Sequence, residues 1–165
     1  MPTRRRTWAP AGHTPIIPYR DKHDRISALA PLTVSPKPQH LGLYVRFQPH
    51  NFPAVNVADF LRALLRHLRG HVILLWEQGS IHQGPAIEAV QKAYPRLHLE
   101  EFPAYAPELN PVEQVWNDFK GYTANSLPRD KRDIRRSLYA NTRRVRRYQA
   151  KLRSFILASK LPSPP

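Results

Sequence analysis

The chain has 165 residues, a formal net charge of +14 and no cysteine, and 41% of its residues are hydrophobic. This length and composition are typical of one globular domain with a modest core. Disulfides and thiolate metal sites are excluded, and no membrane segment is expected because no apolar run approaches the roughly 18–20 residues of a membrane span.

Two strands are predicted after a basic, proline-rich and aperiodic segment that covers residues 1–22. The strands run from Arg25 to Ser35 and from His40 to His50, and the "PKPQ" between them is typical of a turn. In the second strand, apolar residues such as Leu41 and Leu43 occupy every other position, which indicates one wetter face. We therefore expect a β-hairpin.

An amphipathic helix and a buried strand come next. Asn56 can cap the helix and Gly70 ends it, with apolar residues at helical spacing between them. The run "HVILLWE", His71 to Glu77, is short and almost entirely apolar. Such a run is typical of a parallel strand that is buried on both faces.

The alternation of strand and helix then continues. Pro85 begins a helix that stops near Tyr94, and Leu97 to Pro103 form another strand. A further helix begins at Pro111, and its apolar stripe includes Trp116, to which we assign no chemistry. The order β-β-α-β-α-β-α predicts an α/β fold, a mixed sheet with helices on its faces.

Residues 126–165 are predicted to be a basic helical C-terminal extension. From Asp130 to about Ser159, apolar residues recur at a spacing of about 3.5, which predicts one long helix or two helices with a break near Asn141. Few acidic residues interleave with its basic ones. The net charge favours a polyanion, most simply nucleic acid, with an acidic membrane surface as an alternative partner. The basic face of this segment could be merely solvated, but we favour nucleic-acid phosphates as its partner. The arginines expected to contact nucleic acid are Arg135, Arg136, Arg143, Arg144, Arg146 and Arg147.

Two carboxylates are placed to meet at one edge of the sheet. Glu77 lies where the buried strand ends, and Glu113 lies in the first turn of the helix after the next strand. Chemistry in open α/β sheets collects at the carboxyl ends of the strands. Carboxylates held there can bind Mg²⁺ for phosphoryl transfer, although a pair of metal ions would need a third carboxylate.

Each candidate also has an ordinary structural interpretation. Asn110, Pro111 and Glu113 have the spacing of a helix capping box. Glu77 could be an acid that flanks a turn. His82 is a candidate auxiliary ligand or base, or a structural histidine in the same turn. Asn110 is a candidate auxiliary residue beside Glu113.

Three motifs resemble a known family. The stretches "TWAPAGHTP", "LLWEQGSIHQG" and "FPAYAPELNPVEQVWNDFKGYTAN" are similar to the catalytic domain of bacterial insertion-sequence transposases of the mariner-related superfamily, the DDE superfamily endonucleases. The similarity runs in order from about Arg6 to Asn125. The motif "YAPELNPVEQVW" downstream of "LLW" and a histidine carries most of its specificity.

The resemblance implies a ribonuclease H-like fold and DNA strand cleavage and strand transfer that depend on Mg²⁺ or Mn²⁺. In that family three carboxylates hold the metal ions, and Glu77 and Glu113 match the second and third. The implied partners are transposon-end and target DNA and a second transposase subunit, in the bacterial cytoplasm with the nucleoid.

The chain departs from the family pattern at the first two carboxylates. Glu77 stands where the family has aspartate, and a glutamate places its carboxylate one methylene further out. The strand that carries the first aspartate normally precedes the "TWAP" segment, so we expect residues 1–125 to be an N-terminally truncated domain that lacks this central strand. Asp21 and Asp24 are the only nearby substitutes.

These departures predict that the "HVILLWE" strand lacks a partner on one side and that strand transfer is impaired or absent. A non-catalytic nucleic-acid-binding remnant of a transposase is the alternative. A decayed chain that does not fold stably is a third possibility.

Overall fold

The predicted β-hairpin is present in the computed structural model, which describes residues 8–13, 16, 26–36, 40–124, 126, 128 and 130–161. Each arm of the hairpin is divided into two short strands. The strands are β1 (Ser27–Leu29), β2 (Leu32–Val34), β3 (Leu41–Leu43) and β4 (Arg46–Gln48). β1 pairs with β4 and β2 with β3, both antiparallel.

The interruption between the two strand pairs does not change the register of the hairpin. Leu29 faces Arg46 on one side of the gap, and Leu32 faces Leu43 on the other. The gap contains Pro31, which has no N–H to donate to a ladder. Its carbonyl oxygen still accepts a hydrogen bond from the Tyr44 N–H at 3.1 Å. The two pairs therefore form one hairpin.

The rest of the predicted order is confirmed. The elements that follow the hairpin are α1 (Ala54–His67), β5 (Val72–Trp76), a 3₁₀ turn η1 (Ser80–His82), α2 (Pro85–Ala93), β6 (Leu97–Glu101), a 3₁₀ turn η2 (Pro107–Leu109), α3 (Val112–Thr123), α4 (Lys131–Arg146) and α5 (Gln149–Leu157). The mixed α/β class is thus confirmed. A single mixed sheet is not observed, because the described strands form three separate two-stranded ladders.

The start of α1 differs from the prediction. The helix begins at Ala54 after Pro53, so Asn56 lies in its first turn rather than at its cap. The Pro53 carbonyl accepts from the N–H groups of Asn56 and Val57. The Asn56 side chain instead donates to Gln48 Oε1 at 3.2 Å and ties the helix to the hairpin.

The prediction that β5 is buried on both faces is wrong. Trp76 is buried, but Ile73 and Leu75 on the other face are 67% and 45% exposed. β5 pairs in parallel with β6, from Val72 opposite Leu97 onward. Within the described ranges its other edge has no strand beside it, and no element covers the face that carries Ile73 and Leu75.

The basic C-terminal segment folds as two helices rather than one long helix, and the break is not near Asn141. The chain turns at Arg147 and Tyr148, between α4 and α5. Asn141 is fully buried within α4, and its amide donates to Asp118 and accepts from Arg144. Because its polar atoms have tertiary partners, Asn141 does not need to end the helix.

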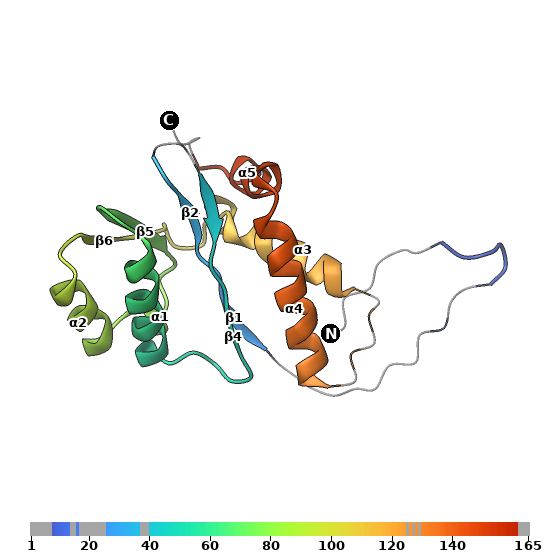
Figure 1. Ribbon diagram of the computed structural model, residues 1–165, viewed down its shortest axis with the longest axis horizontal. Coiled ribbons are helices and arrows are strands. Elements are labelled where there is room, and N and C mark those ends of the chain that lie inside the picture. Colours follow the sequence, from blue (N-terminus) through green and yellow to red (C-terminus); the bar gives the residue numbers. More distant parts are fainter. Residues whose placement is uncertain are drawn as a thin grey trace.

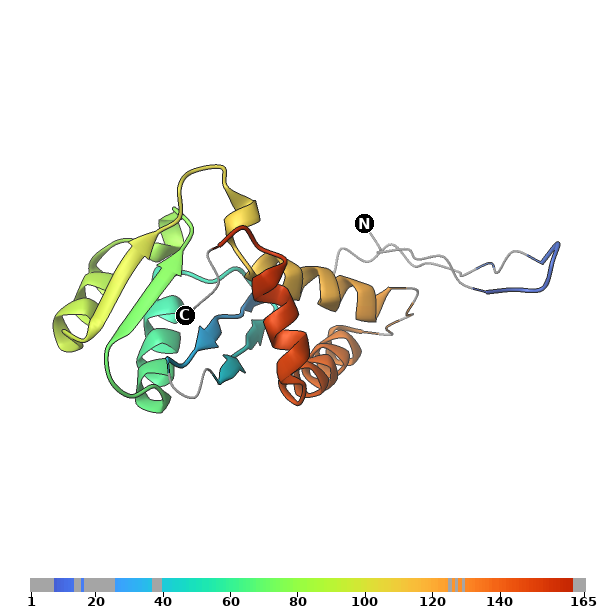
Figure 2. The ribbon, with the colours of Figure 1, turned by 90° about the horizontal axis from the view of Figure 1, so that it is seen from above.

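Two apolar clusters hold the elements together. The first joins the hairpin to α3, α4 and α5, with Leu43, Val115 and Leu152 at its centre. The second joins β5, β6, α1 and α2 around residues such as Leu65 and Val90. Figures 1 and 2 show the hairpin with α3, α4 and α5 on one side and β5, β6, α1 and α2 on the other. No helix among the described residues has the length and apolar character needed to cross a membrane.

Candidate active site and basic surface

Glu77 and the start of α3 are joined by Asn110. Glu77 is exposed and directly follows β5. Asn110 Nδ2 donates to Glu77 Oε1 at 2.7 Å. The other atom of the same amide, Asn110 Oδ1, accepts from the N–H of Val112, the first residue of α3, at 3.0 Å. One side chain therefore holds the end of a strand against the beginning of a helix.

Glu113 lies in the first turn of α3, beside this junction. Its N–H donates to the Asn110 carbonyl at 3.1 Å. Its carboxylate makes no hydrogen bond or ion pair within the part of the chain that the structure describes. The backbone of Glu113 thus takes part in the helix start, while its carboxylate is available to a ligand.

His82 is held firmly against the end of β5. Its ring stacks on that of Trp76, with centroids 4.6 Å apart and planes 5° from parallel. Its Nδ1 lies 2.6 Å from the Glu77 carbonyl oxygen. Since a carbonyl only accepts, Nδ1 must carry the hydrogen of this bond. The histidine therefore fixes the backbone of the Glu77 turn.

The described residues do not contain a cluster of three or more acidic, histidine or cysteine side chains that could hold a metal ion. Of the carboxylates predicted from the sequence, Glu77 follows β5 and Glu113 lies in the first turn of α3. The substitutes considered from the sequence, Asp21 and Asp24, lie outside the described residues.

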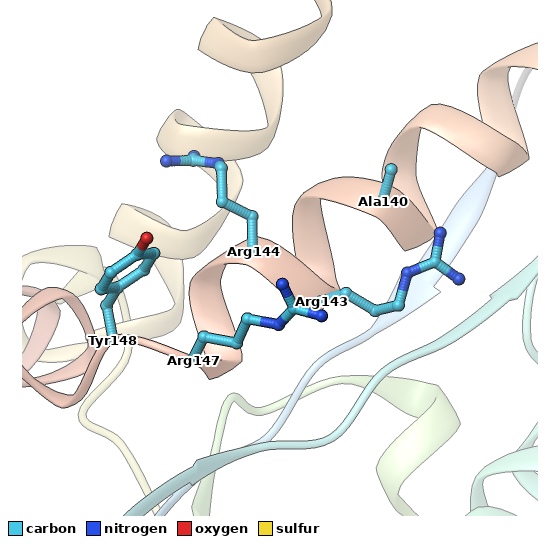
Figure 3. Close-up of a pocket in the computed structure, with 5 residues that line it drawn as sticks. All are labelled: Ala140, Arg143, Arg144, Arg147 and Tyr148. Carbon is cyan, nitrogen blue, oxygen red and sulfur yellow. The ribbon is translucent and has the colours of Figure 1, made fainter.

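The arginines expected to bind nucleic acid fall into three pairs. Arg143 and Arg147 are exposed, and their guanidinium groups have no partner within the described ranges. They line a surface pocket of about 220 Å³ at the turn between α4 and α5, together with Ala140, Arg144 and Tyr148 (Figure 3).

Arg144 and Arg146 are committed to contacts within the fold. Arg144 donates to Asp118 Oδ2 at 2.9 Å and lies over the ring of Tyr122. Arg146 donates to the Leu43 carbonyl and lies over the Tyr44 ring, which ties α4 to the hairpin.

Arg135 and Arg136 remain exposed on α4. Arg135 lies over the ring of Tyr139, with 5.6 Å from its Cζ to the ring centroid. Arg136 is 3.8 Å from Asp133, in an exposed pair of the kind that contributes little to stability.

Sequence reasoning missed Asp118, which is the centre of an ionic cluster. Its carboxylate accepts from Arg144 and Asn141 on α4 and pairs with Lys151 on α5 at 2.9 Å. Burial opposes its ionisation, but the hydrogen bonds from Lys151 and Asn141 and the neighbouring positive charges outweigh that effect, and the pKa of Asp118 is lowered. The periodicity of a single helix does not predict a contact between residues of three different helices.

Tyr148 is one of the residues that recur at the apolar spacing predicted for the C-terminal helix, but it is 61% exposed. The stripe passes through the turn after Arg147, where the backbone leaves the path of α4 and turns the ring outward. The exposure of Tyr148 could have been predicted only from the position of the break between the two helices.

Comparison with known proteins identifies the family. The profile described as DDE superfamily endonuclease matches residues 1–135, more than half of the chain. The chain belongs to the DDE superfamily endonucleases. The prediction made from the three sequence motifs is confirmed at this level.

One solved structure similar to this DDE endonuclease chain is that of the Mos1 transposase in a paired-end complex with the left transposon end. The TM-score is 0.59 at 14% sequence identity, and the match covers 95% of this chain and 51% of the Mos1 chain. The similarity concerns the fold, and this chain spans about half the length of that protein. A search of curated proteins gave no match.

Proposed function

We propose that this chain is the DDE domain of a mariner-related bacterial insertion-sequence transposase that binds DNA but whose strand cleavage and strand transfer are impaired or absent. The family membership and the similarity in fold to the Mos1 transposase support the transposase assignment. The observation that supports impairment is that the described residues contain no cluster of three or more side chains that could hold a metal ion.

The residues at the β5–α3 junction do not fit a complete two-metal site. The family uses divalent metal ions, and two ions would need more oxygen ligands than Glu77 and Glu113 provide. The Asn110 side chain is already engaged. Its Oδ1 accepts a hydrogen bond from the Val112 N–H, and its Nδ2 donates one to Glu77, so we do not count it as a further ligand. We therefore derive no metal-dependent step for this chain.

Charge supports DNA as the partner. The net charge of +14 favours a polyanion. Arg143 and Arg147, whose guanidinium groups have no partner among the described residues, line one surface pocket whose lining contains no acidic side chain. Guanidinium groups match phosphate geometry with paired hydrogen bonds.

A nicking assay tests the catalytic half of this proposal. Purified chain is incubated with supercoiled plasmid and Mg²⁺ or Mn²⁺, beside the isosteric variant Glu113→Gln. We expect no metal-dependent nicking above that of the variant. Robust cleavage that the variant abolishes would show that Glu113 works in a functional site and would contradict the claim of impairment.

Titration of a labelled 30-base-pair duplex tests the binding half. We expect the double variant Arg143→Gln/Arg147→Gln to raise Kd by about tenfold and to lower the salt slope by about two. The matched control Arg66→Gln/Arg69→Gln removes equal charge from two exposed arginines near the end of α1. Equal effects of the two double variants would refute an interface on α4, and no binding by the unaltered chain would refute DNA as its partner.

A further inference from the structure

The pocket between α4 and α5 combines free positive charge with an exposed aromatic ring. Arg143 and Arg147 come from the last turn and the end of α4, and Tyr148 is the next residue along the chain. Figure 3 shows the Arg144 side chain extending away from those of Arg143 and Arg147. Arg144 is paired with Asp118, so the uncompensated charge of the pocket belongs to Arg143 and Arg147.

The backbone fixes the position of Tyr148 in advance. Its N–H donates to the Val145 carbonyl at 3.1 Å, and its own carbonyl accepts from Lys151 and Leu152 at 3.0 and 3.1 Å. Tyr148 therefore belongs to the hydrogen-bonded ends of both helices. Its ring makes no stacking or cation–π contact within the described residues.

The other tyrosines that flank the basic residues of α4 are used differently. Tyr44, Tyr122 and Tyr139 each lie beneath an arginine of that helix. Such a contact occupies a ring face that a ligand could otherwise use. Tyr148 has no such contact, so its ring is available to a ligand.

The chemistry of the pocket suits a nucleotide that is not base-paired. Phosphates of an intact duplex need only cations, whereas an aromatic ring gains energy from stacking on a base that has left the duplex. The volume of about 220 Å³ is below the usual range of pockets for large cofactors or drug-sized ligands. It suits one small group, such as the phosphate of a nucleotide.

We infer that this pocket is a subsite for one unpaired nucleotide of DNA. Arg143 and Arg147 bind its phosphate, and the ring of Tyr148 stacks on its base. This inference rests on the proposed DNA-binding function and specifies which DNA structure the α4–α5 turn recognises.

The test compares two DNA probes of equal length and equal phosphate number, a continuous 30-base-pair duplex and the same sequence with four mismatched positions at its centre. Fluorescence anisotropy at several salt concentrations gives Kd for each. The variants are Tyr148→Ala, Tyr148→Phe, and the control Leu157→Ala, which removes an exposed apolar side chain from the end of α5.

We expect the unaltered chain to bind the mismatched probe more tightly. Tyr148→Ala should weaken that binding by about tenfold, as for the loss of one stacked base, and change duplex binding by less than about twofold. Tyr148→Phe keeps the stacking face and should keep the preference, as should Leu157→Ala.

Several results would overturn the inference. One is the absence of any preference between the probes, and another is a preference that survives Tyr148→Ala, which would reflect only the flexibility of mismatched DNA. Equal losses on both probes would also overturn it. Failure of the unaltered chain to bind either probe would refute the proposed DNA-binding function itself, and is therefore distinct from a failure of the subsite.

Discussion

Asp118 connects three helices through one carboxylate. Its side chain is 10% exposed, whereas those of Arg144 and Lys151 are 45% and 39% exposed. The buried anion is compensated by cations that reach in from the surface, and Asn141 completes its hydrogen bonds. Removing the negative charge would leave two cations facing each other.

Asp118→Asn should therefore destabilise the fold, by about 1–2 kcal/mol at pH 7, after allowance for the solvent that screens its exposed partners. The pKa of Asp118 is lower in the folded chain than its ordinary value of 3.8. Its contribution is thus fully present above pH 3.8 and is lost as the pH falls below that value.

Urea denaturation of the unaltered chain and of Asp118→Asn, at pH 7 and near pH 3, measures this effect. The difference between their free energies of unfolding should be smaller near pH 3 than at pH 7. Asp59→Asn is the control, because Asp59 forms an exposed pair with Arg62, and it should change stability by less than about 0.5 kcal/mol. A difference between Asp118→Asn and the unaltered chain that does not depend on pH would contradict the role given to the charge.

At the scale of elements, β5 has one paired and one unpaired edge. The Val72 N–H donates to the Arg96 carbonyl, on the side of β6. Since N–H groups of a strand point alternately to its two edges, those of Leu74 and Trp76 share that side. Those of Ile73 and Leu75 point to the edge that has no strand beside it among the described residues.

Amide hydrogen exchange followed by NMR should show this alternation. We expect Leu74 and Trp76 to be protected, and Ile73 and Leu75 to exchange at least about a hundredfold faster, because no ladder bond has to open first. The amides of the paired hairpin strands serve as the internal reference. Equal protection along β5 would mean that a further strand pairs with it in solution.

Periodicity predicted the elements of this chain well, because amphipathic spacing is a local property. It predicted α2 and the order of strands, and the spacing around Asn110 indicated the start of α3. The roles of the arginines could not be predicted in this way. Arg143 and Arg144 are neighbours of identical chemistry, yet only Arg144 faces Asp118, and that depends on how α3 packs against α4.

The candidate site was predicted in part for the same reason. Strand ends placed Glu77 near the start of α3, and the structure adds the Asn110 hydrogen bond that joins them. The exposure of Ile73 could not be foreseen, because an apolar run reports the residues of a strand and not the neighbours that cover it.

In the molecule as a whole, the basic C-terminal helices are part of the core. Leu152 and Phe155 of α5 pack in the same cluster as Leu43 and Phe47 of the hairpin. A detachable DNA-binding tail would not share a cluster with the hairpin. The division into a domain of residues 1–125 and an extension of residues 126–165 stays a prediction from the sequence motifs.

Leu152→Ala should lower the free energy of unfolding by about 2–5 kcal/mol, because Leu152 is completely buried and its loss leaves a cavity. Leu157→Ala, on the same helix, should change it by less than about 0.5 kcal/mol, since Leu157 is 63% exposed. Thermal or urea denaturation measures both. Similar small effects of the two variants would show that α5 does not contribute to the core.

Gln149 binds the edge of β3 as a neighbouring strand would. Its Oε1 accepts from the Leu41 N–H, and its Nε2 donates to the Leu41 carbonyl, both at 2.9 Å, across 108 positions of sequence. The contact between Gln149 and Leu41 has a kinetic consequence, since contacts between residues so distant in sequence form slowly. During synthesis the hairpin precedes the helices that cover it, so Leu41 and Leu43 stay partly uncovered until α5 has been made. The hairpin is thus completed only after the 108 positions that separate Leu41 from Gln149 have been made.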